Sequence, residues 1–563
     1  MTRPEASSGL SPEQATEPGA TFRVAPRVPE PASLVARLQA GDPALAPFYA
    51  GHPGDAAAYE RKAAEVAERL PAAARRAAGA AIRATTPAAA ARLERILAGQ
   101  GYFVTTGQQT GLFGGPLFVA HKILTAVRLA AALEERLGQP VAPLFWVASE
   151  DHDFREIASF RLLDRTESVR TIRLPDAPEA PPVAMARRLL GQDVNAAVEA
   201  LAAQLPDTPW SGELLDVVRG AYRPDATVAE AFTELVAHVF APFDLCIVEA
   251  HHPALKAASV PVLGAALTEA GRDAAAVGGQ SARLAAAGFR EQVAVEADAA
   301  NLLFEDEHGR ERLVRDGRGW ALRRTNRVLE AERAVALLQA EPWRFSPNVH
   351  LRPVVESALL PTVCYVGGPA EVSYFAQIGC LFHAHGVAPP VVRPRASLDV
   401  IERAAYKVLR DYGLTPADFA APFERVAKQV ARRDMPEDVL RAEAALEAAL
   451  REGYAALHAA ALEIDPNVEG PVLHGLNVSL SALERVRDRL ATHLKRADQV
   501  KLARLGRAAA HLWPDGQPQE RALGFLPYVA RYGPAFLEGV AAAIHTPLDA
   551  AAPAWRGVEC QDG

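Results

Sequence analysis

Two segments of the chain share one pattern, in which a short strand-like run leads through Gly-Gly-Pro into a helix. The first joins residues 102–105 to a helix expected over about 116–137, and the second joins residues 362–366 to a helix that begins at Pro369. Proline is favoured at the first position of a helix because no N–H group is needed there. Strands that alternate with helices in this way predict an α/β fold with a parallel sheet.

The loop of the first segment is rich in glycine, so its backbone can bring bare N–H groups to the start of the helix. Such a terminus stabilises phosphate or carboxylate through its donors and its dipole. Lys122, within two turns of the loop, could reach a phosphate as a point charge. The predicted nucleotide-binding residues are Gly107, Gly111, Gly114, Gly115, Lys122, Arg393 and Arg395. Two plainer interpretations stay open: a tight strand-to-helix connection for the loop, and solvated surface charge for the two arginines.

A second polar group, Glu150-Asp151-His152-Asp153, follows the apolar run Val141–Val147, which is typical of a strand buried on both faces. Ligands of open α/β sheets bind beyond the carboxyl ends of strands. Three carboxylates around one imidazole could hold an amine, bind Mg²⁺ or supply a general base. The plain alternative is a polar turn that caps the next helix.

A third group surrounds the second Gly-Gly-Pro segment, where Asn348 and Arg352 offer an amide and a cationic fork suited to carboxylate or phosphate. The residues predicted to bind substrate are Gln108, Gln109, Glu150, Asn348, Arg352 and Glu371. Those predicted to act in catalysis are His121, Asp151, His152 and Asp153. For His121 the alternative of an ordinary half-buried histidine stays open.

The composition excludes several classes of protein. The formal net charge of −8 disfavours a nucleic acid partner, and no apolar stretch approaches the roughly 18 residues of a membrane span. The four cysteines, Cys246, Cys364, Cys380 and Cys560, contain no C-x-x-C pair, which argues against a disulfide framework and a cysteine-based zinc cluster. We therefore expect a cytoplasmic protein without a membrane partner, in which Cys364 and Cys380 are buried apolar residues, with a redox role beside the second Gly-Gly-Pro loop as the alternative.

The strand–helix rhythm is interrupted twice, which predicts one sheet with two insertions. The second insertion contains three short segments typical of antiparallel strands. The predicted parts are core residues 1–162 (with 1–22 expected to be mobile), 236–262 and 341–396, insertions 163–235 and 263–340, a coiled-coil domain 397–515 and a C-terminal helical segment 516–563.

Leucines at heptad spacing in the late part of the chain predict two long helices joined near Pro466, as an antiparallel coiled coil or an ordinary amphipathic pair. The second helix carries a basic run from Arg485 to Arg507. A solvated helix face explains such a run by default. A nucleotide phosphate or the acid-rich partner helix are the alternatives.

Together these motifs resemble one known family, the cysteine ligases of bacillithiol biosynthesis. The combination is far more specific than a lone glycine-rich loop and spans most of the chain, from about residue 102 to 521. The matching stretches are T-G-Q-Q-x-G at 106–111, E-D-H-D-F at 150–154, L-R-P at 351–353, G-G-P-A-E at 367–371 and G-Q-P-Q-E-R at 516–521.

The resemblance implies a Rossmann-like core similar to that of class I aminoacyl-tRNA synthetases, two connecting-peptide insertions, and a homodimer formed through the coiled coil. It implies a ligase that joins cysteine to the amine of malyl-glucosamine, giving bacillithiol, with ATP or ADP as the expected nucleotide. The related mycothiol ligase holds zinc through cysteine, and no cysteine lies in the matching motifs here, so no zinc is predicted; Mg²⁺ stays open. A different class of function also stays open, a catalytically inactive nucleotide-binding interaction protein that acts through its coiled coil.

Overall fold

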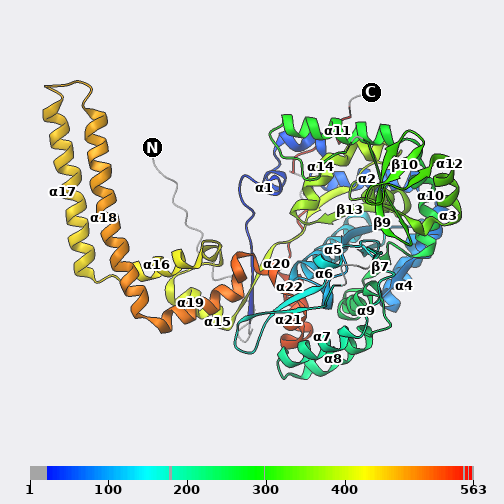
Figure 1. Cartoon of the computed structure of the whole chain (residues 1–563), viewed down its shortest axis with the longest axis horizontal. Coiled ribbons are helices and arrows are strands. Elements are labelled where there is room, and N and C mark those ends of the chain that lie inside the picture. The colour runs from blue at the N-terminus through cyan, green and yellow to red at the C-terminus, as the bar shows by residue number, and fades with distance from the viewer. Residues whose placement is uncertain (1–21, 177–180, 297, 549–551, 556, 561–563) are drawn as a thin grey trace. The chain divides into compact units, whose positions relative to one another are not determined.

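The structure is a computed structural model, drawn whole in Figure 1, and it describes residues 22–176, 181–296, 298–548, 552–555 and 557–560. The chain divides into two compact units. Among the described residues, unit 1 contains Asp399–Ala522, Thr166–Val169, Phe22 and Arg23, and unit 2 contains the rest. The segment expected to be mobile, residues 1–22, lies outside the described residues except for Phe22.

In the described part of unit 2, a six-stranded sheet has the order β14-β13-β3-β4-β7-β2. Its strands are β2 (Ile82–Ala84), β3 (Tyr102–Gln108), β4 (Val141–Val147), β7 (Cys246–Glu249), β13 (Thr362–Gly367) and β14 (Val391–Pro394). All neighbours are parallel except β2, which pairs antiparallel with β7 at one edge. The chain passes from β3 to β4 on one side and returns to β13 and β14 on the other, so the strand order reverses beside β3. This arrangement confirms the predicted Rossmann-like fold, and ligands of such sheets bind at the reversal.

Both faces of the sheet are buried because successive apolar residues of a strand point to opposite sides. In β3, Val104 packs in one cluster with Leu129 of α5 (Leu117–Leu137), and Phe103 packs in another with Ile96 of α4 (Pro87–Leu97). The helix expected over about 116–137 is α5, and Gly138 ends it with φ +63°, a left-handed conformation that glycine adopts without strain. Helix α2 (Ala56–Arg69) precedes the sheet and is capped by the Asp55 side chain, which accepts the N–H of Ala57.

The two interruptions of the sheet fold differently from each other. In the first, α7, α8 and α9 follow the short strands β5 and β6, and Figure 1 shows α8 and α9 together. Their bounds are β5 (Ser159–Leu163), β6 (Val169–Arg173), α7 (Asp193–Gln204), α8 (Pro209–Ala221) and α9 (Val228–Phe240). In the second, helices α10 (Pro253–Thr268) and α11 (Ala270–Ala286) precede an antiparallel sheet and α12 (Ala331–Ala340).

The antiparallel sheet of the second interruption has the order β11-β10-β9-β8-β12. Its strands are β8 (Ala299–Asp306), β9 (Gly309–Asp316), β10 (Gly319–Leu322), β11 (Val328–Glu330) and β12 (Phe345–Pro347). The three strands predicted in this region are present. The chain before these strands is helical, and Val277 and Leu284 of α11 pack into the core.

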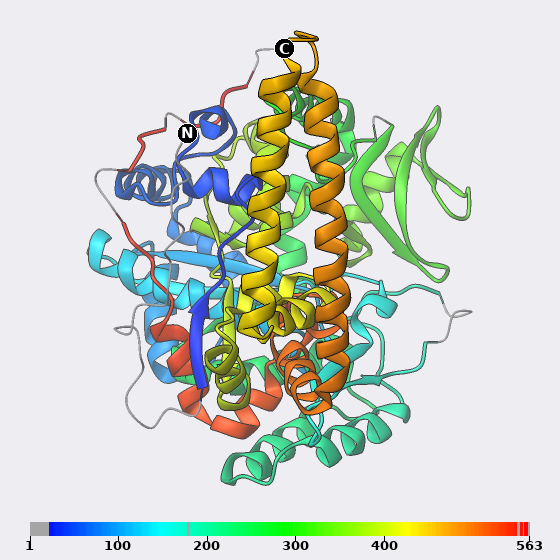
Figure 2. The ribbon, with the colours of Figure 1, turned by 90° about the vertical axis from the view of Figure 1, so that its left-hand side faces the viewer.

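Unit 1 is helical, and α17 and α18 form a long hairpin whose helices lie side by side in Figure 2. Its helices are α15 (Arg403–Tyr412), α16 (Phe423–Arg433), α17 (Glu437–Ala461), α18 (Glu469–Ala497) and α19 (Gln499–Leu512). The turn between α17 and α18 contains Pro466, as predicted. Among the described residues, no helix is both long and apolar enough to span a bilayer.

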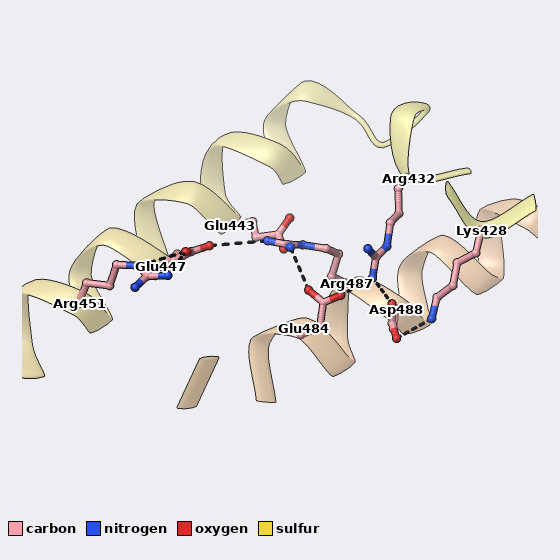
Figure 3. Close-up of polar contacts among 8 residues, drawn as sticks. All are labelled: Lys428, Arg432, Glu443, Glu447, Arg451, Glu484, Arg487 and Asp488. Carbon is pink, nitrogen blue, oxygen red and sulfur yellow. Dashed lines mark hydrogen bonds and ion pairs between the residues drawn. The ribbon is translucent and has the colours of Figure 1, made fainter. Parts of the chain in front are cut away.

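Ion pairs connect the helices of the hairpin (Figure 3). Arg487 of α18 pairs with Glu443 of α17 and, at 2.9 Å, with Glu484 one turn away. Asp488 pairs with Arg432 and, at 2.5 Å, with Lys428, both from α16. For Arg487, the acid-rich partner helix is therefore the correct interpretation of the predicted basic run.

A disulfide joins Cys380 to Cys560, with 5.6 Å between their Cα atoms. The expectations of a chain without disulfides and of Cys380 as a buried thiol were therefore wrong. The two cysteines are 180 residues apart in sequence, and nothing in their spacing indicates that the fold brings them together. Cys246 and Cys364 are buried thiols, as expected for Cys364.

Candidate active site

The polar motifs meet at one edge of the large sheet because parallel strands end on the same side. Gln108 ends β3, Glu150 to Asp153 follow β4, Gly368 follows β13 and Arg395 follows β14. Lys122 of α5 joins them because its side chain reaches back along the helix to the carbonyl oxygen of Gly107, 2.7 Å away. The residues form two groups, one buried and one that lines a pocket.

The buried group, which we call the lysine network, contains Lys122, Gln108, Glu371, Tyr365, Arg352 and Glu356. Lys122 donates to Gln108 Oε1 at 2.9 Å and forms an ion pair with Glu371. Glu371 also accepts hydrogen bonds from the Tyr365 hydroxyl at 2.6 Å and from Gly368 N–H at 2.7 Å. Arg352 donates to Glu356 at 2.7 Å, so each cation of the network has a carboxylate partner.

The electrostatics of the lysine network hold Glu371 as a carboxylate. Burial raises the pKa of Glu371. The charge of Lys122 and the hydrogen bonds from Lys122, Tyr365 and Gly368 lower this pKa by a larger amount, so its net shift is downward. Burial lowers the pKa of Lys122, and Arg395 and Arg352 add to that effect, against the attraction of Glu371. Because Lys122 and Arg352 are already paired inside the protein, neither is an uncommitted cation for a phosphate.

The glycine loop also uses its donors within the chain. Gly111 N–H donates to Gln109 O at 3.0 Å, and Gly115 N–H donates to Leu112 O at 3.0 Å. Gly114 N–H donates to the backbone of Gly111 at 3.2 Å. Such a loop offers fewer donors to an anion than the sequence pattern predicts.

The ring of Phe525 closes the loop from one side. A Cβ atom on Gly114, whose φ is +85°, would lie 2.5 Å from that ring. Glycine is therefore needed at this position for close packing and backbone conformation. The role of a tight connection, left open above, accounts for Gly114.

The second group lines a cavity of about 770 Å³, which we call the motif pocket. Its wall comes from the segment after β4, from the first interruption and from the antiparallel sheet. The charged and imidazole side chains of the wall are Asp151, His152, Asp153, Arg155, Glu156, Asp176, Arg188, His308 and Arg324. The volume lies within the range of about 300–1,000 Å³ that small-molecule sites occupy.

Asp151 is held as a carboxylate in the motif pocket. Burial raises its pKa. A hydrogen bond from Gln109, the charge of Arg310 and the N–H groups of His152 and Asp153 lower the pKa by a larger amount, so it is below the ordinary value. Gln109 Nε2 also donates to Glu156 at 3.0 Å and so connects the first loop to the pocket.

His152 is held as a neutral ring. Burial lowers its pKa, and the charge of Arg310 lowers it further against the opposing effect of Asp151. Arg310 of β9, which is buried, lies with NH1 2.9 Å from His152 Nδ1 and donates through Nε to Ser346 at 2.8 Å. With Nδ1 accepting from Arg310, the ring proton is assigned to Nε2, which makes His152 a hydrogen-bond donor.

Several predicted site residues have other partners. Glu150 is buried in an ion pair with Lys256, so it is not available to a substrate amine. Asn348 caps the turn before α13 (Arg352–Leu359) by accepting from His350 N–H at 3.0 Å, and it donates to Asn301.

Three further predicted residues belong neither to the lysine network nor to the wall of the motif pocket. His121 is fully buried on α5. Arg393 donates to Pro53 O at 2.8 Å. Arg395 donates to Ala396 O at 3.0 Å, and its guanidinium stacks on Phe118.

No sequence pattern indicated the residues that support the site from distant parts of the chain. Lys256 and Arg310 come from the second interruption, where single basic residues follow ordinary helical and strand patterns. Tyr365 and Glu356 lie in an apolar strand and on the short helix α13. For Glu356 a weak signal exists, since it stands four residues after Arg352, the spacing of a helical ion pair.

Unit 1 contains a separate cavity of about 550 Å³ between α15 and α19, which we call the basic groove. Arg403, Lys407, Arg504, Arg507 and His511 line it. Arg504 pairs with Asp411 at 2.5 Å, whereas no ion pair of Arg403 or Lys407 exists within the described chain. The groove therefore presents cations that an anion could neutralise.

His511 lies at the buried end of the groove, with Nδ1 2.9 Å from Glu402 and Nε2 3.6 Å from Glu167. Burial disfavours the charged ring, but these two carboxylates outweigh it and raise the pKa of His511 to about 9.

Comparison with known proteins agrees with the motifs. The family model described as bacillithiol biosynthesis BshC, N-terminal Rossmann-like domain, matches residues 25–396, and that of the BshC C-terminal coiled-coil domain matches residues 399–549. A cysteine ligase BshC of Salinibacter ruber is 34% identical over 456 residues, 79% of this chain and 81% of that protein. One of Koribacter versatilis is 32% identical over 80% of this chain and 82% of its own. The chain therefore belongs to the BshC family of bacillithiol biosynthesis, whose members compared here are named cysteine ligases.

Proposed function

We propose that this chain joins the carboxyl group of cysteine to the amine of malyl-glucosamine, after nucleotide-driven activation of the carboxyl group, and so forms bacillithiol. The observation that carries the proposal is the motif pocket, in which Asp151 is ionised and His152 is a neutral donor. The names of the BshC relatives support cysteine as the amino acid.

The charges of the motif pocket suit substrates that carry both an ammonium and a carboxylate group. Asp151, Asp153 and Glu156 are carboxylates on the wall, and Arg188 and Arg324 are cations on it. A carboxylate attracts an ammonium group, and an arginine fork binds a carboxylate through two parallel hydrogen bonds. Cysteine and a malyl-substituted amino sugar each contain both kinds of group.

Within the reaction, Asp151 would orient the ammonium group, since it is kept ionised and already accepts hydrogen bonds from Gln109 and His152 N–H. The proton of the attacking amine would pass to Asp153, which faces the same pocket and accepts the N–H of Glu156 at 3.3 Å. His152 would donate from Nε2 to the oxygen that becomes negative as the amide forms.

We propose that the nucleotide binds at residues other than those predicted from the sequence. The glycine loop uses its own N–H groups and Lys122 is paired with Glu371, so the predicted core site does not fit a phosphate group. The basic groove fits a nucleotide such as ADP, because Arg403 and Lys407 would neutralise phosphate charge; since its lining residues are not those of the motif pocket, a nucleotide held there does not itself activate the carboxyl group. ADP should bind the wild-type chain in equilibrium dialysis and bind Arg403→Ala/Lys407→Ala at least about tenfold more weakly. An Arg410→Ala chain, altered at an exposed arginine of the same helix, should bind like wild type.

The reaction is tested with the purified full chain, cysteine, ATP and malyl-glucosamine, with the thiol product measured by mass spectrometry. Asp151→Asn should lower the rate by about 10²-fold or more. Glu199→Gln, an exposed carboxylate on α7, is the matched control and should leave it unchanged. Absence of product from the wild-type chain would reject the reaction, and a normal rate in Asp151→Asn would reject the role of Asp151.

The homodimer is a further part of the proposal, with the α17–α18 hairpin as its surface. Leu446, Leu457, Leu473 and Val486 are each at least half exposed on these helices. Exposed apolar side chains on a long helical hairpin favour an association site. A second copy would cover it as the a and d positions of a coiled coil are covered.

Sedimentation velocity should give twice the mass of the chain for wild type and the monomer mass for Leu446→Glu/Leu473→Glu. Val500→Glu, on α19, is the control. A wild-type monomer would reject the dimer. The inactive interaction protein considered above would instead bind ADP, form no thiol product and lose a heterologous partner when the hairpin is altered.

A further inference from the structure

A disulfide ties the end of unit 2 to helix α14 (Pro369–Ala384). After α22 (Pro534–Ala542), the described residues 543–548, 552–555 and 557–560 form neither helix nor strand, and we call them the tail. The matched family region ends at residue 549, so Trp555 and Cys560 lie beyond it. Membership of the BshC family therefore does not explain this part of the chain.

Side-chain packing docks the tail as well. Trp555 is 6% exposed, and its ring packs edge-on against His52 at 5.3 Å between centroids and beside Tyr49 at 6.4 Å. Val558 lies against Gly379 of α14, where a Cβ atom would meet a methyl group at 2.7 Å. The surface of α14 is therefore shaped to receive the tail.

The two sulfur atoms differ in access. Cys380 is 9% exposed on α14, whereas Cys560 is an exposed residue. Arg283 of α11 lies beside Cys560, since it donates to the backbone oxygen of Glu559 and stands 3.7 Å from its carboxylate. A thiol in solution can thus reach Cys560 Sγ more readily than Cys380 Sγ, and access determines which sulfur is attacked.

The tail also touches residues that support the lysine network. Tyr49, which Trp555 covers, donates its hydroxyl to Val372 O at 2.8 Å. Val372 follows Glu371 in the first turn of α14, and Glu371 is the partner of Lys122. Docking of the tail therefore reinforces the turn that presents Glu371.

We propose that Cys380 and Cys560 form a reversible thiol–disulfide site, at which a low-molecular-weight thiol reacts with Cys560 and releases the tail from α14. This inference is independent of the reaction proposed above, because it rests only on the tail and the two sulfur atoms.

The exchange occurs in two steps. A thiolate attacks Cys560 Sγ, the bond between the two protein sulfurs breaks, and its electron pair leaves with Cys380, which takes a proton from solvent. A second thiolate attacks the mixed disulfide on Cys560 and leaves Cys560 as a thiol. Two small thiols are oxidised to one small disulfide, and the protein disulfide is reduced by the same two electrons.

The first test identifies the sulfur that reacts. The full chain, oxidised with cystine and freed of excess, receives cysteine briefly and then iodoacetamide, and the peptides are analysed by mass spectrometry. We expect cysteine attached to Cys560 and the alkyl group on Cys380. The opposite labelling would overturn the proposal, and so would alkylation of both residues before cysteine is added.

The second test measures release of the tail by hydrogen exchange of peptides that contain Trp555. Reduction should speed exchange roughly tenfold or more, since a released segment loses its protection. Cys560→Ser should exchange fast under both conditions, and Cys246→Ala, which keeps both bonded sulfurs, should respond like wild type. Equal protection of the oxidised and reduced tail would overturn the proposal.

Discussion

The buried pair of Lys256 and Glu150 offers a sharp test of how the motif after β4 is held. Lys256 is 3% exposed and Glu150 is 7% exposed. Lys256 Nζ contacts Glu150 Oε1 and also donates to Phe345 O, so it bridges the motif to β12. Lys256→Met keeps most of the side-chain volume but leaves the carboxylate buried without its cation. Removing one partner of a buried pair costs about 3–5 kcal/mol.

The double variant Lys256→Met/Glu150→Leu removes both charges and keeps a similar volume. It should recover all but about 1 kcal/mol of the free energy of unfolding, because an apolar pair of similar size is often as stable as a buried ion pair. The two single variants and the double variant form a double-mutant cycle, in which the coupling is the sum of the two single losses less the loss in the double variant, roughly 5–9 kcal/mol if each single variant loses about 3–5 kcal/mol.

Urea unfolding followed by tryptophan fluorescence measures this effect in unit 2, which contains all the tryptophans except Trp513. A Lys256→Met chain within about 1 kcal/mol of wild type would refute the reasoning, since the carboxylate would then have found water. Turnover in the folded double variant would assign Glu150 a structural role, against its predicted role in substrate binding.

Three further perturbations test separate features. Gly524→Ala would put a Cβ atom 2.0 Å from a ring carbon and should cost about 1–3 kcal/mol in urea unfolding, whereas Gly278→Ala, in an open helical position, should be neutral or stabilising; equal midpoints would contradict this. The raised pKa of His511 contributes stability to unit 1 that is complete below pH 6.5 and is lost as the pH rises through about 9, on the order of 3 kcal/mol; His511→Gln should unfold without that pH dependence. The charge of Arg310 is the second-largest cause, after burial, of the lowered pKa of His152. Arg310→Met removes this charge, so NMR should show the His152 ring titrating at higher pH; an unchanged titration would exclude the effect.

The regular part of the fold could be predicted because its signals are local. Strand β4 is an uninterrupted apolar run, and α5 is bounded by Pro116 and Gly138. Strand β7 begins only at Cys246, because Ala241–Phe243 form a 3-10 turn and Asp244 has φ +52°. Helix α11 was missed because three glycines dilute its pattern, whereas tertiary contacts with α14 stabilise it.

The site could be predicted only as far as the sheet determines it. Parallel strands bring Gln109 and Asp151 together regardless of what the insertions do. Several charged side chains in the site have partners that are distant in sequence. Examples are the pairs Lys256–Glu150 and Arg310–His152, which are separated by 106 and 158 residues. No local pattern encodes such pairs, so the sequence could not show that Glu150, predicted to bind substrate, is paired with Lys256.

The reversal of strand order beside β3 has a consequence for synthesis on the ribosome. Strand β3 gains one neighbour, β4, soon after it emerges, but its other neighbour, β13, emerges roughly 250 residues later. At about 5–20 residues per second, that edge stays uncovered for on the order of 10–50 s. An apolar strand with an open edge is a template for aggregation. Nascent chains that pause between these strands are therefore the ones we expect chaperones to bind.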